Sequence, residues 1–348
     1  MNPSNTPLFP LKFAPIYKEK VWGGRSLARF GRLLPGDDQT MIGESWELAD
    51  LDQTSSSGGG GGSERSVISN GSLAQMTLHE AMDHFGERLL GHLQLTETGN
   101  FPLLIKFLDA KQNLSVQVHP SDEYTRVHPE THLKNEAWYV IDADPGAVIY
   151  KGIQEDVTPQ QLRQAIENDN LEPLLIRVPV KTGDCHYLPS GTCHALGAGV
   201  LVAEIQNPSD TTFRIYDWGR TNRKLHVDQA LECITFGSAN IHHHEKRSHI
   251  AGMFTTVSRL VMCEHFCIEK VRMVESYEQE IPYDQPVVWM VLEGEGVITP
   301  GNDTKPVHFQ RGETLLIPAH MDDAKVALQT DAIWLEVTFP QMQPRGII

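Results

Sequence analysis

Short stretches in which apolar and polar residues alternate, separated by turn residues, make up much of the chain. Residues 42–48 are one example, residues 21–24 form another short extended piece, and denser apolar stretches occupy 101–118 and 138–150. Alternation with a period of two indicates half-buried strands, and the Asp-Pro-Gly at 144–146 is typical of a turn between strands. The first half of the chain is therefore predicted to be rich in short strands.

Three stretches have helical spacing instead. Residues 78–90 place apolar side chains at helical intervals, and residues 158–168 begin with Thr158 as the N-cap and Pro159 in the first turn. Residues 225–236 have a similar pattern. We expect these helices as short insertions in a mainly β protein.

A second series of strand patterns favours a barrel. Residues 178–188, 195–206 and 212–216 are typical of short antiparallel strands, with turn residues between them. Many short strands in this order favour a β-barrel or jelly roll.

The strand-turn pattern occurs twice. Gly312-Glu313 stands before a strand and a proline, as Gly183-Asp184 does earlier, and both resemble the turn of the cupin barrel (a double-stranded β-helix). We predict a metal-binding cupin domain at 1–250 and a cupin-like domain at 251–348. The second domain lacks a pair of histidines at the matching positions, so we expect no metal ligands there.

Two segments have compositions that do not support a core. Residues 55–62 are serine and glycine, which predicts a solvated surface loop, and residues 241–249, with three consecutive histidines, predict a polar connector. We assign neither segment a function.

The charge balance narrows the choice of partners. The chain has 348 residues, with 29 basic and 45 acidic ones and a formal net charge of -16. No basic field would attract a nucleic acid or an anionic membrane. A small anionic substrate remains compatible, provided that lysines and arginines gather in a pocket.

The N-terminus and the cysteines bear on location. No basic segment followed by an apolar run predicts a signal peptide, and no transmembrane helix is apparent. Five irregularly spaced cysteines do not resemble a secreted disulfide framework. We therefore expect a cytoplasmic protein.

Four residues point to a divalent metal site. Gln117 and His119 are two apart in a strand pattern, so both should face one side of the sheet, and Glu136 and His194 lie in similar surroundings. This mixture of nitrogen and oxygen donors suits zinc or another first-row ion and can leave a position open for substrate.

A competing set of metal ligands is Cys185-His186 with Cys193-His194. It lacks the spacing of a zinc knuckle and would leave Gln117, His119 and Glu136 without a role. We favour the mixed nitrogen and oxygen site.

The ordered motifs of the chain resemble one enzyme family, the mannose-6-phosphate isomerases, and in particular their compact bacterial form with two cupin barrels. The resemblance covers nearly the whole length. It rests on Lys18-Glu19-Lys20-Val21-Trp22-Gly23-Gly24, Gly43-Glu44-Ser45-Trp46, Phe101-Pro102-Leu103-Leu104-Ile105-Lys106, the Gln117 and His119 pair, Asn135-Glu136-Ala137-Trp138-Tyr139, residues 189–196 and Phe213-Arg214-Ile215-Tyr216-Asp217.

The resemblance implies an activity and a site. It implies one zinc ion per chain and the reversible conversion of mannose 6-phosphate into fructose 6-phosphate, in a monomer or homodimer. The implied zinc ligands are His119, Glu136, His194 and, as the fourth, Gln117. Arg214 corresponds to the family's catalytic arginine, and the implied pocket residues are Trp22, Glu44, Lys106, Ser115 and Lys134.

The reaction itself sets further requirements. Moving a proton between adjacent carbons of an aldose or ketose needs a base and a positive group for the enediolate that forms. Arg214 suits charge stabilisation, because a guanidinium does not readily release its proton. The sequence leaves the proton carrier open among Lys134, Glu44 and a metal-bound water.

Two other classes of protein remain as alternatives. An iron-dependent cupin dioxygenase would consume oxygen, and a non-catalytic sugar-binding cupin would bind a sugar phosphate without turnover. The dioxygenase has no evident need for Lys106, Lys134 and Arg214 together.

Overall fold

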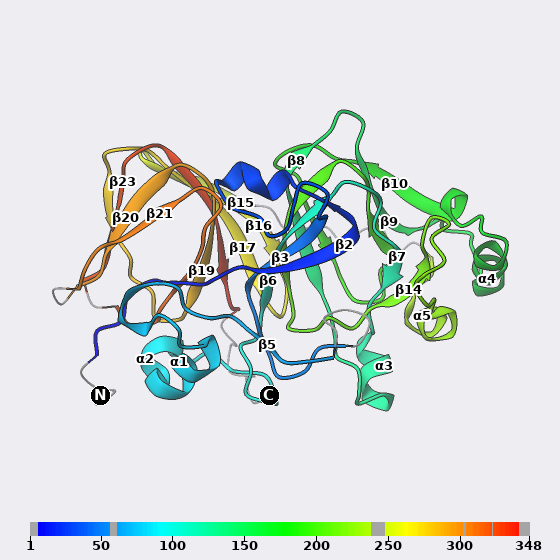
Figure 1. The fold of residues 1–348 in the computed structure, drawn as a ribbon, viewed down its shortest axis with the longest axis horizontal. Helices are drawn as coiled ribbons and strands as arrows, with labels where there is room; N and C mark the ends of the chain where they lie inside the picture. Colours follow the sequence, from blue (N-terminus) through cyan, green and yellow to red (C-terminus); the bar gives the residue numbers. More distant parts are fainter. Residues whose placement is uncertain (1–5, 56–60, 238–247, 302–303, 322, 341–348) are drawn as a thin grey trace, which may run out of the picture. The chain divides into compact units, whose positions relative to one another are not determined.

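The computed structural model describes residues 6–55, 61–237, 248–301, 304–321 and 323–340. Contacts divide the chain into two compact units, each built from segments distant in sequence (Figure 1). We call Pro15–Glu64 with Asn100–His244 the inner unit, and Met1–Ala14, Arg65–Gly99 and Glu245–Ile348 the terminal unit. The prediction of a mainly β protein with few helices is confirmed.

Two antiparallel sheets form the inner unit. The six-stranded sheet has the order β11-β8-β13-β6-β2-β3, and the five-stranded sheet has the order β10-β9-β12-β7-β14. The strands of the first are β2 (Ile16–Gly24), β3 (Ile42–Leu48), β6 (Leu104–Ala110), β8 (Glu136–Ala143), β11 (Cys185–Leu188) and β13 (Val200–Gln206). Those of the second are β7 (Val116–Val118), β9 (Val148–Ile153), β10 (Leu175–Pro179), β12 (His194–Leu196) and β14 (Phe213–Tyr216).

The core of the inner unit joins its two sheets. Trp138 and Val202 from the six-stranded sheet belong to the same buried cluster as Ile149 and Leu196 from the five-stranded sheet. Burial of these apolar faces supplies the main driving force for closing the sheets on one another.

Three helices of the inner unit pack on the other face of the five-stranded sheet. They are α3 (Asp122–Val127), α4 (Pro159–Glu167) and α5 (Val227–Cys233), and Leu162 and Ala230 join the buried cluster that includes Val118. Thr158 is the N-cap of α4, as predicted, and it also forms a capping box with Gln161. The short segments η2 (Ser26–Phe30), η4 (Glu172–Leu174) and β4 (Asp50–Leu51) complete the unit.

The terminal unit is also built from antiparallel strands. One sheet has the order β1-β22-β19-β24-β17-β16-β15 and the other β18-β23-β20-β21. The strands are β1 (Leu11–Lys12), β15 (Ser248–Ala251), β16 (Thr255–Met262), β17 (Cys267–Met273), β18 (Glu278–Glu280), β19 (Val287–Glu293), β20 (Glu295–Thr299), β21 (Val307–Gln310), β22 (Thr314–Ile317), β23 (Lys325–Leu328) and β24 (Ala332–Thr338).

Two N-terminal segments belong to the terminal unit rather than to the inner one, which differs from a simple division at residue 250. Strand β1 pairs with β22, with Leu11 opposite Leu316. The backbone N–H of Ala319 donates to the carbonyl of Leu89 at 3.0 Å, which ties the helical segment to the C-terminal strands. Backbone pairing therefore gathers these pieces into one unit.

The predicted helix at 78–90 is split in two. Helix α1 (Leu78–Phe85) begins with a capping box at Thr77, and α2 (Glu87–Leu90) follows directly. Gly86 between them has a φ of 51°, which glycine adopts more easily than other residues. The unit also contains η3 (Gly71–Leu73), and β5 (Glu64–Arg65) lies where the chain passes between the units.

The repeated glycine-acid turn is present in both units with the same hydrogen bonds. The N–H of Gly183 donates to the carbonyl of Val140 at 2.8 Å, and that of Gly312 donates to Val291 at 2.8 Å. Both glycines have a positive φ, 92° and 83°. The two turns thus fix matching registers in the two barrels.

Parts of the two low-complexity segments, residues 56–60 and 241–247, lie outside the described residues. No helix in the described part of the chain is long and apolar enough to cross a membrane.

Candidate metal centre and pocket

Three of the four predicted metal ligands form a buried cluster in the inner unit. His119 directly follows β7, Glu136 begins β8 and His194 begins β12. All three side chains are at most 1% exposed, and one possible ligand atom from each lies within 4.8 Å of the others. Among the described residues, no other group of three or more His, Cys, Asp or Glu side chains converges in this way.

Backbone carbonyls set the orientation of both imidazoles. His119 Nδ1 donates to the carbonyl of Thr211 at 3.1 Å, and His194 Nδ1 donates to that of Thr192 at 2.8 Å. Because a carbonyl can only accept, the proton of each neutral ring is assigned to Nδ1. The bare Nε2 atoms therefore face inward, as is usual for histidines that bind metals.

The electrostatics of the cluster fit a bound cation. Burial, together with the charge of Lys134, lowers the pKa of His119 to about 3. Burial alone would raise the pKa of Glu136, but the Lys134 ammonium holds it well below its usual range.

A bare nitrogen therefore faces each oxygen of an ionised carboxylate. His119 Nε2 lies 3.2 Å from Glu136 Oε2, and His194 Nε2 lies 3.0 Å from Oε1, which accepts no hydrogen bond from the described residues. These lone pairs repel one another unless a cation lies among them. The donor set suits a divalent ion.

Gln117 lies beside the same cluster. Its β7 position pairs with His194 in β12 on one side and with Arg214 in β14 on the other. Its Nε2 atom lies 3.4 Å from His194 Nε2. The oxygen and nitrogen of an amide are assigned from context, so a flipped amide would present its oxygen to the centre.

The competing thiol set does not form. Cys185 lies in β11, whereas Cys193 precedes β12 in the opposite sheet. Neither thiol is part of the converging group.

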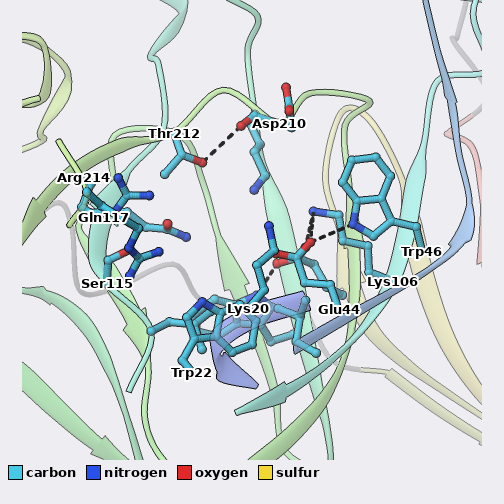
Figure 2. A pocket seen from close by; sticks show the side chains of 16 residues that line it. Lys20, Trp22, Glu44, Trp46, Lys106, Ser115, Gln117, Asp210, Thr212 and Arg214 are labelled. Carbon is cyan, nitrogen blue, oxygen red and sulfur yellow. Dashed lines mark hydrogen bonds and ion pairs between the residues drawn. The ribbon is translucent and has the colours of Figure 1, made fainter. Parts of the chain in front are cut away.

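A pocket with an empty volume of about 680 Å³ adjoins the cluster. Figure 2 shows Ser115, Gln117 and Arg214 gathered at one side and Lys20, Glu44, Lys106 and Trp46 at the other. Its lining also includes every pocket residue predicted from the sequence, namely Trp22, Glu44, Lys106, Ser115, Lys134 and Arg214. Its cationic side chains suit an anionic ligand such as a sugar phosphate.

Lysines on one side of the pocket are held by carboxylates. Lys106 donates to Gln206 at 2.9 Å and forms an ion pair with Glu204 at 3.1 Å. Although burial lowers the pKa of Lys106, Glu204 and Glu44 together raise it above its usual value. Lys106 is therefore a fixed positive charge.

Glu44 belongs to the same charged network. Its carboxylate lies 3.1 Å from Lys20 Nζ and accepts a hydrogen bond from Trp46 Nε1 at 2.7 Å. Burial opposes ionisation, but Lys20 and Lys106 outweigh it and lower the pKa of Glu44 to about 2. Glu44 is thus ionised and a weak proton acceptor.

Arg214 stands apart from these pairs. It is 7% exposed, and its Nη1 donates to the carbonyl of Lys224 at 3.1 Å, while Nε has no hydrogen-bond partner in the described part of the chain. Burial and the charges of Arg223 and Arg220 lower its pKa, although Asp217 opposes this. A guanidinium stays protonated under such conditions, so Arg214 offers the pocket a positive charge.

Several pocket residues escape the sequence analysis. They are Lys20, Glu204, Asp210, Thr212 and Arg223. Glu204 carried a usable signal, since a carboxylate inside the apolar stretch of β13 requires a buried partner, as Lys106 does in β6. Asp210, Thr212 and Arg223 lie outside strand interiors, where the sequence does not specify neighbours.

Comparison with known proteins places this arrangement in context. Residues 8–149 match the family model described as phosphomannose isomerase type I, catalytic domain. The mannose-6-phosphate isomerase ManA of Bacillus subtilis is 38% identical over 325 residues, covering 91% of this chain and 95% of that protein.

Solved structures agree with this likeness. The crystal structure of the mannose 6-phosphate isomerase from Bacillus subtilis aligns with a TM-score of 0.81 at 31% identity, covering 95% of this chain and 99% of that one. A mannose 6-phosphate isomerase bound with zinc and yttrium has the same fold, with a TM-score of 0.68 at 15% identity and coverage of 95% and 99%. The predicted cupin fold is confirmed.

Proposed function

The chain belongs to the mannose-6-phosphate isomerase family, and from this membership we propose how its own residues carry out the isomerisation of mannose 6-phosphate and fructose 6-phosphate. The observation that best supports this proposal is the pair of bare imidazole nitrogens that face the Glu136 carboxylate, beside a pocket lined with cations. The resemblance noted in the sequence is thereby confirmed at the level of the family.

We propose that the metal is one zinc ion, held by His119, Glu136, His194 and Gln117. A relative of the same fold is described as bound with zinc, and the donor set suits that ion. When bound, zinc would supply Lewis acidity toward a substrate oxygen. Thr211 and Thr192 support the site by fixing the ring tautomers through their carbonyls.

The other pocket residues have separate roles in charge stabilisation and substrate positioning. Arg214, with its unpaired Nε, stabilises the negative charge that develops on the substrate oxygens. Trp22 and Ser115 line the pocket and restrict the pose of the sugar, and Lys106 provides a fixed ammonium. Such positioning lowers the barrier, because the reacting groups need not be ordered again at each turnover.

We assign the proton carrier to Lys134. Its Nζ lines the pocket and lies 2.8 Å from Glu136 Oε2, while the side chain is 4% exposed. Glu44 is less suited, because its pKa of about 2 makes it a weak base. We therefore give Glu44 the role of orienting Lys20 and Lys106.

The test is fructose 6-phosphate formation from mannose 6-phosphate by the purified full chain, before chelation, after chelation and after zinc is restored. We expect activity to disappear with the metal and return with zinc. His194→Ala should lose both zinc and activity, and His186→Ala, which alters a histidine of the unformed thiol set, should keep both.

The same preparation separates the alternatives. Oxygen consumption would indicate the cupin dioxygenase. Binding of mannose 6-phosphate by the zinc-loaded protein without turnover would indicate a sugar-binding cupin and overturn the proposed reaction.

A further inference from the structure

The lysines of the pocket are electrically balanced. Each lies within ion-pair distance of a different carboxylate: Lys20 with Glu44 at 3.1 Å, Lys106 with Glu204 at 3.1 Å and Lys134 with Glu136 at 2.8 Å. This side of the pocket therefore presents polar groups and alternating charges but little net charge. Such a surface suits the hydroxyl groups of a sugar.

The arginine side is not balanced. Asp217, 3% exposed, is shared by Arg220 and Arg223, with closest contacts of 2.7 and 2.5 Å. Arg214 adds a third guanidinium that senses the charges of these three residues. With the Asp210 carboxylate, which also lines the pocket, two carboxylates stand against three guanidinium groups, which leaves one positive charge in excess.

Asp210 is held by partners other than the arginines. Its carboxylate also lies at the pocket, but both oxygens accept hydrogen bonds from the backbone N–H of Ser55, at 2.8 and 2.9 Å. Thr212 Oγ1 also contacts the Asp210 backbone carbonyl, at 3.4 Å.

We propose that Arg223, oriented by Asp217, binds the phosphate group of the substrate, and that Asp217 and Arg220 are positioning residues for it. This inference rests on the proposed function and names the part of the pocket that recognises the anionic end of the substrate. A phosphate monoester carries about −1.5 to −2 charges at pH 7, so the net positive charge of this side attracts it. Guanidinium groups also suit phosphate oxygens through paired hydrogen bonds.

The hydrogen bonds from Arg223 to Asp217 fix the orientation of the Arg223 guanidinium. Asp217 accepts from Arg223 Nε at 2.8 Å and from Nη2 at 2.5 Å, and Nη1 has no hydrogen bond to any described residue. Arg220 Nη2 in turn donates to the carbonyl of Asn113 at 2.8 Å, which anchors the cluster. Without Asp217, Arg223, 23% exposed, would be free to turn toward solvent.

The experiment compares Arg223→Gln, Arg223→Lys and Asp217→Asn in the zinc-loaded full chain. Steady-state kinetics with mannose 6-phosphate would be combined with calorimetric titration of inorganic phosphate. Arg163→Gln is the matched control, because Arg163 also pairs with an aspartate, Asp228, in the inner unit but lines no part of this pocket.

We expect Arg223→Gln to raise KM roughly 10- to 100-fold while kcat changes less than about threefold, since one charge-assisted phosphate contact is lost in ground and transition states alike. Phosphate binding should weaken by the same factor. Arg223→Lys should recover part of the loss, and Asp217→Asn should raise KM less than Arg223→Gln does. Arg163→Gln should match the wild type.

Two results would overturn the inference. The first is an unchanged phosphate affinity in folded Arg223→Gln, which would remove the phosphate role. The second is a loss of kcat in Asp217→Asn together with an equal loss of affinity for unphosphorylated mannose, which would indicate a general structural role. If the wild type binds phosphate through Arg223 but does not isomerise the sugar, the proposed function fails while the anion site stands.

Discussion

The two units use one barrel design with different chemistry at matched positions. In the inner unit Trp138 lies opposite Glu204 in the neighbouring strand, and in the terminal unit Trp289 lies opposite Glu336. The next strand places Lys106 opposite Glu204 in the first case but Glu269 opposite Glu336 in the second. The tryptophan and glutamate are shared, whereas the cation is not.

Hydrogen bonding shows what this difference does. Trp138 Nε1 donates directly to Glu204, which pairs with Lys106 at the pocket. In the terminal unit the hydroxyl of Tyr283 donates to Glu336 at 2.7 Å and receives a hydrogen bond from Trp289. The same carboxylate position thus supports a charged pocket in one barrel and a closed polar network in the other.

The position of one proposed metal ligand can be compared directly between the two barrels. Glu136 lies opposite Leu188, and Val287, at the corresponding place, lies opposite Ile317. Both Glu136 and Val287 are fully buried. The comparison indicates that the fold tolerates either side chain there and that the chemistry depends on the local partners.

The largest expected effect comes from giving the inner barrel the residue of the terminal one. Glu136→Val should abolish metal retention and lower activity by about 10³-fold or more, because a ligand is removed and its replacement has no donor. Metal analysis and initial rates would measure this. Glu269→Val, a carboxylate removed from the other barrel, should keep both, and retained zinc in Glu136→Val would contradict the ligand assignment.

The reverse exchange should act on stability rather than on chemistry. Val287→Glu places a carboxylate where the terminal barrel offers an apolar surrounding, so we expect a loss of about 3–5 kcal/mol in unfolding free energy. Urea unfolding would measure it, with Val287→Ala as the control for lost packing. Turnover per folded molecule should be unchanged, and an undiminished unfolding free energy would show that the position can solvate a charge.

Replacing Arg214, which forms no ion pair with a carboxylate among the described residues, should separate charge stabilisation from metal binding. Arg214→Ala should keep its zinc but lose about 10²- to 10³-fold in kcat, as expected for a group that stabilises developing charge. Metal content and steady-state kinetics provide both readings. Normal turnover in this variant would remove Arg214 from the catalytic machinery.

The smallest expected effect is a difference in pH dependence between Glu44 and Glu336. Glu44, with a pKa lowered from 4.5 to about 2, stabilises the fold above pH 4.5 and loses that contribution as the pH falls toward 2. Burial is the main factor that raises the pKa of Glu336 above 4.5, so the folded state favours its protonated form. The stability of the fold therefore falls as the pH rises above 4.5.

Urea unfolding of the chelated protein at several pH values would test these opposite effects of pH on stability. Glu44→Gln should be less sensitive than the wild type below pH 4.5, and Glu336→Gln less sensitive above it. For each variant, the slope of unfolding free energy against pH should differ from the wild-type slope by about 1 kcal/mol per pH unit. Identical slopes for wild type and variants would contradict the charge networks described for these residues.

The sequence was sufficient for the elements with strong local signals. Thr158 and Pro159 predicted the start of α4, and the Gly-Asp and Gly-Glu turns predicted the repeated barrel. The start of α3 also had a signal that the sequence analysis did not use, since Ser121 caps the helix by accepting from Tyr124 N.

The site divides in the same way. The convergence of His119, Glu136 and His194 was predictable, because strand alternation and the family motifs select the same residues. The Asp217, Arg220 and Arg223 cluster was not, because it depends on how a connection after β14 folds back on itself. Pairing between distant loops is a tertiary property that no local pattern specifies.

The interleaved order of the two units has a consequence for biosynthesis. All segments of the inner unit have been translated by residue 244, whereas β1 must wait for β22, with Leu11 opposite Leu316. Closing so long a loop is slow, and domains completed early in translation can fold first. We expect the nascent chain to form the barrel of the inner unit while its earliest strand and the helical segment at 65–99 are still unpaired.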